Sequence, residues 1–215
     1  MNFQPIPQEI LQTHDDSRDE RWEDLFLQAL SQTQLRLLST EAQQGPDQWP
    51  YLMASTEQAT ESAQKILHWL STRGIGLVIN PEKNFPDFIL SYGMIWFFRE
   101  TGRFILRNAA AVPSSSVEIT AASLKKFGPP TEAYLPSYVR KVLQDFFRDQ
   151  GIIAPRCLVI SENGQDYDFA ISVESLGNPP QKEWPQIGEA LSWFLPAHYS
   201  LVLISEKGMP EFVAV

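Results

Sequence analysis

The chain has 215 residues, enough for one large domain or two small ones, so no metal or disulfide is needed to stabilise its core. Hydrophobic residues make up 43% and charged residues 20%, a composition typical of globular proteins and not of disordered or fibrous ones. The 26 acidic and 17 basic residues give a formal charge of -9, which argues against nucleic acid or anionic lipid as the main partner. We therefore expect a basic or neutral partner.

Cysteine and histidine are scarce. The single cysteine, Cys157, cannot form an internal disulfide, and 3 histidines leave few ligands for a zinc site. We expect a reducing compartment, no metal and no cofactor. Residues 1–16 lack the basic and apolar segments of a secretory signal, and the apolar run at 94–98 is far shorter than the roughly 20 residues of a membrane span. The sequence thus predicts a cytoplasmic protein with no membrane partner.

The first predicted element is a helix over residues 19–34. Its apolar residues recur at helical spacing behind an acidic first turn, which suits the positive end of a helix dipole. Residues 34–38 satisfy neither the helical nor the strand period. Residues 43–50 contain Gly45, Pro46 and Asp47, so we expect a loop there.

A crossover unit is predicted next. Residues 51–54 are short and apolar, which indicates a strand. Ser55 and Gln58 have the spacing of a capping box, so we expect a helix to start at Ser55 and to run to about Leu70. Residues 76–79 are typical of a buried strand. Strand, helix and strand within about 30 residues outline a crossover between parallel strands.

The next segment contains aromatic residues and then changes composition. An apolar segment at 88–90 is followed by residues 92–101, which we interpret as a helix between Ser91 and Gly102, with a hairpin as the alternative. A strand is expected over 103–106. The chain then becomes polar and rich in serine and proline, so residues 112–130 are predicted to connect an N-terminal α/β module, 1–111, to a second module.

The second module, residues 131–215, is predicted to have the order α-β-β-α-β. Apolar residues at i, i+3, i+4, i+7 and i+8 indicate a helix that begins at Pro136 and ends at Gly151. Strands at 157–160 and 169–173 flank Asn163 and Gly164, a hairpin turn dipeptide, and should pair antiparallel. A helix around 187–195 and a strand at 199–204 follow. The predicted fold class is α+β, with two small modules, each a mixed or antiparallel sheet covered by helices.

This order resembles the SseB-like family, proteins linked to enhanced serine sensitivity. In the first half the likeness rests on Tyr51-Leu52-Met53-Ala54-Ser55-Thr56-Glu57 and Gly76-Leu77-Val78-Ile79-Asn80-Pro81. In the second half it rests on the helix after Leu135-Pro136, the Asn163-Gly164 hairpin and Leu201-Val202-Leu203-Ile204. The aromatic segment 92–100 departs from the pattern. The resemblance implies a cytosolic protein without catalysis, and it carries no catalytic residue to this chain.

Candidate chemistry is weak in this sequence. Cys157 and His198 could form a nucleophile and base, but their spacing matches no cysteine-enzyme signature, and a cysteine between apolar residues is usually inert. The acidic residues Glu162, Asp166 and Asp168 lack the spacing of a calcium loop. We predict no catalytic, cofactor-binding or metal-binding residue.

An interaction surface is the functional hypothesis. Trp, Tyr, Met and Arg are enriched at the centres of protein interfaces, and one segment concentrates them. The candidate interaction residues are Tyr92, Met94, Trp96, Phe98, Arg99 and Arg103. Packing of the aromatic residues in the core is the alternative. The arginines and phenylalanines could also suggest single-stranded nucleic acid, but neither half of the chain is basic.

We therefore expect a non-catalytic cytosolic interaction or adaptor protein that binds another protein or a second copy of itself. Two alternatives stay open. One is an acidic immunity-type inhibitor of a basic partner, acting by charge complementarity. The other is an enzyme with a site built from dispersed carboxylates.

Overall fold

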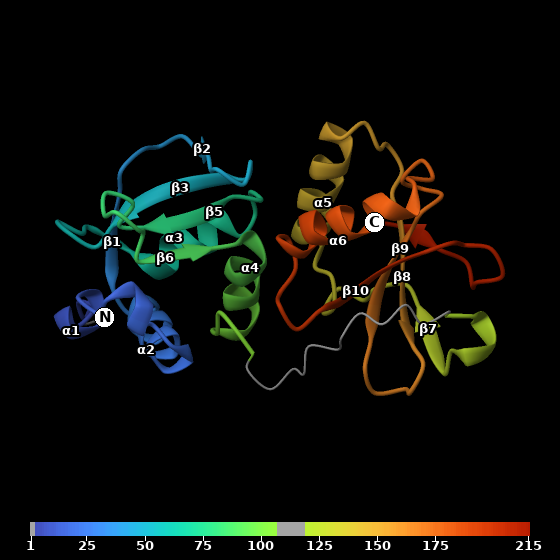
Figure 1. Cartoon of the computed structure of the whole chain (residues 1–215), viewed down its shortest axis with the longest axis horizontal. Coiled ribbons are helices and arrows are strands. Elements are labelled where there is room, and N and C mark those ends of the chain that lie inside the picture. Colours follow the sequence, from blue (N-terminus) through green and yellow to red (C-terminus); the bar gives the residue numbers. More distant parts are fainter. Residues whose placement is uncertain (1–2, 107–118) are drawn as a thin grey trace. The chain divides into compact units, whose positions relative to one another are not determined.

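Helices and strands gather into two units, Met1–Ile105 and Leu106–Val215, in a computed structural model that describes residues 3–106 and 119–215 (Figure 1). Each unit has its own mixed sheet with helices, so the predicted α+β class is confirmed. Residues 112–118 of the expected connecting segment lie outside the described residues.

The first unit contains a sheet in the order β4-β1-β3-β5-β6, with β2 paired to β3. Only β3 and β5 are parallel; the other pairs are antiparallel. The helices are α1 (Gln8–Leu11), α2 (Glu20–Leu30), α3 (Ala63–Leu70) and α4 (Tyr92–Thr101), with a short 3-10 helix at Asp15–Ser17. The strands are β1 (Gln34–Leu37), β2 (Gln43–Gln44), β3 (Pro50–Ser55), β4 (Glu61–Ser62), β5 (Gly76–Ile79) and β6 (Phe88–Leu90).

Capping residues set the limits of two of these helices. The Asp19 carboxylate accepts a hydrogen bond from the backbone N–H of Trp22 at 2.8 Å. Asp19 is thus the N-cap of α2, which starts at Glu20. Ser91 caps α4 in the same way, and Gly102 ends it with a φ of 72°, a left-handed conformation that glycine adopts without strain. The helix predicted over 92–101 is confirmed. The strand predicted over 103–106 is wrong, since these residues belong to no helix or strand.

The predicted crossover between parallel strands is confirmed, because α3 connects β3 to β5. The predicted start of its helix at Ser55 is wrong. Residues 61–62 pair with β1 as strand β4, and Gln58 has a φ of 49°, so the helix starts only at Ala63. The Ser55 hydroxyl instead accepts a hydrogen bond from the N–H of Glu57 in a local turn.

One face of the sheet forms the core of the first unit. The register places Leu52, Leu77 and Leu90 side by side across β3, β5 and β6, and all are almost fully buried. They pack in one cluster with buried residues of α2 and α3, including Phe26 and Leu67. Burial of this apolar row is the main stabilising term of the unit.

A close approach fixes the start of β5. A Cβ atom at Gly76 would lie 2.5 Å from the ring of Tyr51 and 2.7 Å from the backbone oxygen of Leu90. Any side chain larger than hydrogen would therefore push neighbouring strands apart. The Tyr51 hydroxyl is in turn held by the Asp47 carboxylate at 2.6 Å.

A buried carboxylate ties the loop between β5 and β6 to the N-terminal segment. The side chain of Asp87 is 0% exposed and lies 3.0 Å from the guanidinium of Arg18 and 2.7 Å from the ammonium of Lys83. The side-chain amide of Asn80 donates to the same carboxylate at 2.6 Å. A buried charge with partners on several sides retains favourable interactions that offset the loss of its hydration.

The second unit has a sheet in the order β10-β9-β8-β11, with β7 also paired to β8. Here β9 and β10 are parallel and the other pairs antiparallel. The helices are α5 (Ser137–Asp149) and α6 (Trp184–Ser192), with short 3-10 helices at Ala121–Ser123 and Gln181–Glu183. The strands are β7 (Lys126–Gly128), β8 (Arg156–Ser161), β9 (Asp168–Ser172), β10 (Ser200–Ile204) and β11 (Val213–Ala214).

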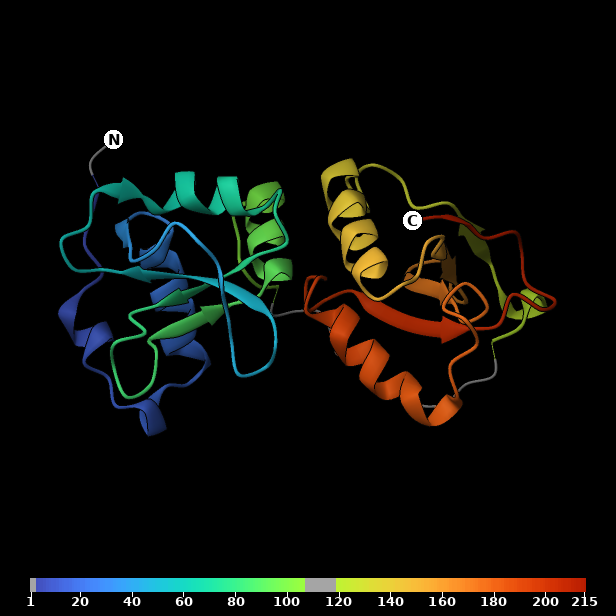
Figure 2. The same ribbon diagram turned by 90° about the horizontal axis from the view of Figure 1, so that it is seen from above.

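The predicted α-β-β-α-β order is present in this unit as α5, β8, β9, α6 and β10. Figure 2 shows α5 in yellow, α6 in orange and the strand β10 that follows it. The hairpin of β8 and β9 around Asn163 and Gly164 is confirmed as antiparallel. Two strands were not predicted. One of them, β7, lies inside the segment expected to be a connection, and it extends this sheet by pairing with the end of β8. In the described residues no helix has the length and apolar character to cross a bilayer.

Replacing Asp87 tests the buried network. Asp87→Ala leaves Arg18 and Lys83 without their shared partner, so we expect the free energy of unfolding of the first unit to fall by about 3 kcal/mol. The measurement is urea denaturation. The control is Asp16→Ala in the same unit, whose side chain is 92% exposed and which should change stability by less than about 0.5 kcal/mol. Equal losses in the two variants would contradict a structural role for Asp87.

Candidate functional site

The structure places the core of the predicted interaction surface inside the first unit. Tyr92 is 0% and Trp96 2% exposed, so these two residues are packing residues and the prediction that they form an exposed surface is wrong. The Tyr92 hydroxyl donates to the backbone oxygen of Ser71 at 2.6 Å, which satisfies it in the interior. Burial also raises the pKa of Tyr92 above its usual value. Most of the surface of α4 is buried, since Tyr92, Gly93, Ile95, Trp96 and Phe97 are all buried residues.

The other four predicted residues, on α4 and just after it, differ in how far their side chains are buried. Met94 and Phe98 are partly buried and pack against the core, and the ring of Phe98 stacks on Phe104 at 4.3 Å. Arg99 is partly exposed and donates to the hydroxyl of Ser71 at 3.0 Å, whereas Arg103 is exposed. The six residues therefore do not form one surface.

The cysteine is structural. Cys157 is 0% exposed, and burial raises the pKa of its thiol to about 12, with Arg140 acting weakly in the opposite direction. A thiol with such a pKa is protonated at neutral pH and is a poor nucleophile. Burial lowers the pKa of His198 below its ordinary value. Cys157 therefore has the properties of a packing residue, whereas His198 is only partly buried.

The acidic hairpin tip is held by its own hydrogen bonds. The side-chain oxygen of Asn163 accepts from the N–H groups of Gln165 and Asp166, both at 2.8 Å, and its amide donates to the Asp166 carboxylate at 2.7 Å. This is an Asx turn. No group of three or more His, Cys, Asp or Glu side chains in the described residues could hold a metal ion.

In both units the carboxyl ends of the parallel strands are closed by internal hydrogen bonds. Ligands of open α/β sheets often bind at such edges. At the end of β3 the hydroxyl of Ser55 donates to Glu82, and at the end of β9 Ser172 bonds to Glu206. The polar side chains at these edges serve the loops that follow the strands.

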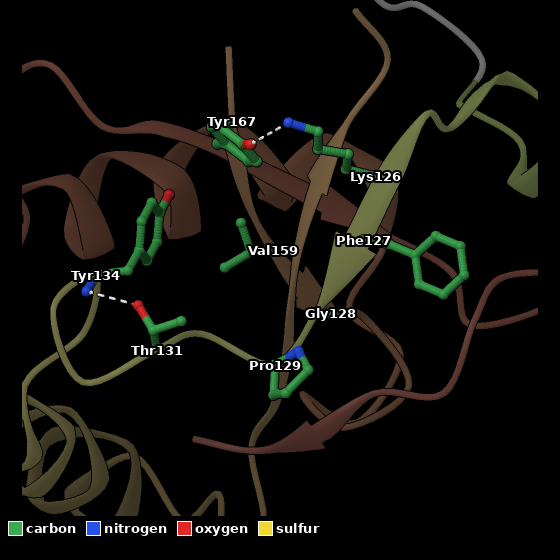
Figure 3. A pocket seen from close by; sticks show the side chains of 8 residues that line it. All are labelled: Lys126, Phe127, Gly128, Pro129, Thr131, Tyr134, Val159 and Tyr167. Carbon is green, nitrogen blue, oxygen red and sulfur yellow. Dashed lines mark hydrogen bonds between the residues drawn. The ribbon is translucent and has the colours of Figure 1, made fainter. Parts of the chain in front are cut away.

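A pocket of about 380 Å³ lies in the second unit, between β7, the segment after it and the β8–β9 hairpin (Figure 3). We call it the tyrosine pocket. Its lining residues are Lys126, Phe127, Gly128, Pro129, Thr131, Tyr134, Val159 and Tyr167. The volume is at the lower end of the range of ligand-binding pockets, about 300–1,000 Å³.

A missing side chain creates this pocket. The register pairs Gly128 of β7 with Val159 of β8, so a side chain at 128 would lie beside Val159 on the same face of the sheet. A Cβ atom built at Gly128 meets no other atom within 4 Å. The space therefore stays open, with Val159 at its floor. The ring of Phe127 points away from the other lining side chains, on the far side of β7 (Figure 3).

Two tyrosine rings form the walls of the tyrosine pocket. Tyr167 is 41% exposed, and its hydroxyl accepts a hydrogen bond from the Lys126 ammonium at 3.2 Å. Tyr134 lies above Thr131, on the side of Val159 away from β7 (Figure 3). Its ring packs 4.7 Å from that of Tyr199. The pocket thus combines apolar ring faces with one cation at its rim.

The loop that carries Tyr134 is held in place by α5. The guanidinium of Arg140 donates to the backbone oxygens of Pro130 at 2.5 Å and Leu135 at 3.0 Å. The hydroxyl of Tyr199 donates to the backbone oxygen of Tyr134 at 2.5 Å. The wall is therefore fixed from both ends, which reduces the entropy cost of ordering it around a ligand.

The hydroxyl of Tyr134 is an unusual polar group behind the wall of the pocket. It is buried and makes no hydrogen bond with the described residues. Burial raises the pKa of Tyr134 above its usual value, and the nearby Tyr199 and Asp168 act in the same direction. The group is therefore a neutral donor at physiological pH. A buried donor without an acceptor costs about 1–3 kcal/mol, and because solvent does not reach this hydroxyl, the tyrosine pocket presents the ring of Tyr134 and not its donor.

Sequence reasoning missed this pocket. Residues 127–130, with two prolines after Phe127 and Gly128, were interpreted as a connection. The signal that could have indicated a site is the pattern of aromatic, glycine and proline residues so close together. The pairing of Gly128 with Val159 joins residues 31 positions apart, from 128 to 159, and was not readable from the sequence.

Comparison of the chain with protein families, with curated proteins and with solved structures finds no match.

Replacing Trp96 separates a core role from a surface role. Trp96→Ala should lower the free energy of unfolding of the first unit by about 3–5 kcal/mol, because it leaves a large cavity. The control is Trp69→Ala on α3, since Trp69 is 41% exposed and its loss should cost about 0.5 kcal/mol or less. Urea denaturation of both variants measures the difference. If the Trp96→Ala protein were as stable as the parent, the assignment of Trp96 to the core would be wrong.

The reactivity of Cys157 tests its assignment as a packing residue. The folded protein should react with iodoacetamide at pH 8 far more slowly than free cysteine does, because the thiol is buried and its pKa is about 12. The same protein in concentrated urea should react at the rate of free cysteine. Mass spectrometry counts the adducts, and rapid modification of the folded chain would contradict the assignment.

Proposed function

We propose that this chain is a non-catalytic, cytoplasmic protein-binding module whose tyrosine pocket holds an extended, proline-containing segment of a partner protein. The role is of the class that the resemblance to the SseB-like family implied, and membership of that family is part of the proposal. The observation that carries it is the open space beside Gly128, walled by Tyr134 and Tyr167.

The chemistry of the walls supports a proline-containing ligand. Extended proline-rich segments dock in grooves lined by aromatic rings, because the flat ring faces pack against the proline side chains. Such segments have no internal hydrogen bonds, so their backbone carbonyls are free to accept. The ammonium of Lys126 at the rim of the pocket is a donor that one of these carbonyls could meet.

The polar groups around the pocket support binding over catalysis. Lys126 is bound to the hydroxyl of Tyr167, and the thiol of Cys157 on the same strand as Val159 is protonated at neutral pH. Neither group has the activated form that a nucleophile or general base requires. A pocket walled by aromatic rings, with one cation at its rim, is suited to recognising the shape of a ligand.

The test fills the tyrosine pocket without disturbing the fold. A ten-residue polyproline peptide is titrated into the full chain by calorimetry, and we expect a dissociation constant of about 1 mM or tighter. Gly128→Leu places a side chain in the open space, so the affinity should fall at least about tenfold. Gly188→Leu on α6 is the matched control, since a Cβ atom there also meets nothing within 4 Å, and it should bind as the parent does.

A second variant tests the hydroxyl alone. Tyr134→Phe keeps the ring that forms the wall and removes a hydroxyl that solvent does not reach, so peptide affinity should stay within about twofold of the parent value. Stability should stay equal or rise, because the hydroxyl has no acceptor in the described residues. Absence of binding to the parent, or unchanged binding by Gly128→Leu, would refute the proposal.

A further inference from the structure

The outer face of α3 gathers positive charge on a chain whose formal charge is -9. We call it the basic face and define it by Lys65, His68, Trp69, Arg73 and Arg99. These residues line an open depression of about 630 Å³ together with Gln64 and Thr72. None of the lining residues is acidic.

Helix geometry aligns these side chains. Lys65 and Trp69 are four residues apart on α3, so they lie on the same side of the helix, and His68 is adjacent to both. Arg73 comes from the turn after the helix, and Arg99 comes from α4, which packs against α3. The basic face is thus built by two helices of the first unit.

Two of the cations are held in position. The guanidinium of Arg73 lies 3.9 Å from the ring centre of Trp69 and donates to the backbone oxygen of that residue at 2.8 Å. Arg99 donates to the hydroxyl of Ser71 at 3.0 Å. A planar guanidinium stacked on an indole keeps its charge while it loses little mobility on binding.

The other two polar groups are available. The side chains of Lys65 and His68 make no ion pair or hydrogen bond with the part of the chain that the structure describes. The nearest acidic residues in the sequence are Glu61, before α3, and Glu100, which lies 3.9 Å from Arg99 at the edge of the face. No acidic residue is among those that line the depression, so its lining carries positive charge without a carboxylate.

We propose that the basic face binds an extended acidic segment of a partner protein. Lys65, Arg73 and Arg99 come from α3, the turn after it and α4, so their charges are distributed around the depression and not concentrated at one point. Alternate side chains of an extended chain are about 7 Å apart, so two or three carboxylates of one segment can reach these cations at once. The exposed ring of Trp69 supplies apolar contact between them.

The site is independent of the tyrosine pocket, because the two lie in different units. An acidic partner differs from the basic or neutral partner that the net charge alone predicts. A chain of charge -9 repels acidic partners at long range, but a local cluster can bind one at short range, where screening by salt removes the long-range term.

The test uses a ten-residue polyglutamate peptide and the full chain. Binding is followed by calorimetry and by tryptophan fluorescence at low and at physiological ionic strength. We expect binding that weakens as salt rises, no binding of polyglutamine of the same length, and a fluorescence change that Trp69→Phe abolishes. Polyglutamine that binds as well as polyglutamate would overturn the proposal, and so would a fluorescence change that survives Trp69→Phe.

Charge reversal locates the site. The double variant with Lys65→Glu and Arg73→Glu should weaken polyglutamate binding at least about tenfold. Lys182→Glu, an exposed lysine of the second unit, is the matched control and should cost much less. Gly128→Leu should leave the binding of polyglutamate unchanged. This variant therefore distinguishes binding at the basic face from binding in the tyrosine pocket. Equal effects of the double variant and of Lys182→Glu would overturn the proposal.

Two further outcomes distinguish other occupants. Competition by inorganic phosphate at the concentration of the peptide would indicate a small-anion site and would overturn the proposal. Self-association of the parent chain that the double charge reversal abolishes would identify a second copy as the occupant, and it would overturn the proposal as well. Sedimentation at several protein concentrations measures this.

Discussion

Each sheet contains one pair of parallel strands, and this constraint determines much of what surrounds it. Parallel strands cannot be joined by a tight turn, so the chain must leave the sheet and return through a helix. In the first unit this helix is α3, which packs one side on the core and presents Lys65 and Trp69 on the other. In the second unit α6 has the same role between β9 and β10. The proposed basic face is thus a by-product of a connection that the fold requires.

Local patterns in the sequence were sufficient for elements that are stabilised locally. Ser91 and Gly102 mark the ends of α4 because both act within one turn of the helix. The pattern failed where distant residues decide. Ser55 and Gln58 have the spacing of a cap, but the pairing of residues 61–62 with β1 places the start of α3 later. A segment without strong propensity, 126–128, became a strand because β8 offered an unpaired edge.

The candidate sites likewise divide into features that local sequence indicates and features that depend on distant residues. A cluster of aromatic residues in the sequence indicates either a core or a surface, and only the packing of α4 places Trp96 inside. The tyrosine pocket could not be predicted, because it depends on an absent side chain at Gly128 opposite Val159 in another strand. The basic face was partly readable. Arg99 was identified from the sequence, but its neighbours on α3 become visible only when the two helices are packed together.

Asn80 joins two requirements that no other amino acid meets together. Its φ of 53° favours glycine, asparagine or aspartate, and its side chain accepts from the N–H of Thr56 while it donates to the Asp87 carboxylate. Glycine would satisfy the backbone and lose both hydrogen bonds, and aspartate would place a second negative charge against Asp87. Among sequences that share this loop, variation at position 80 should therefore be nearly absent.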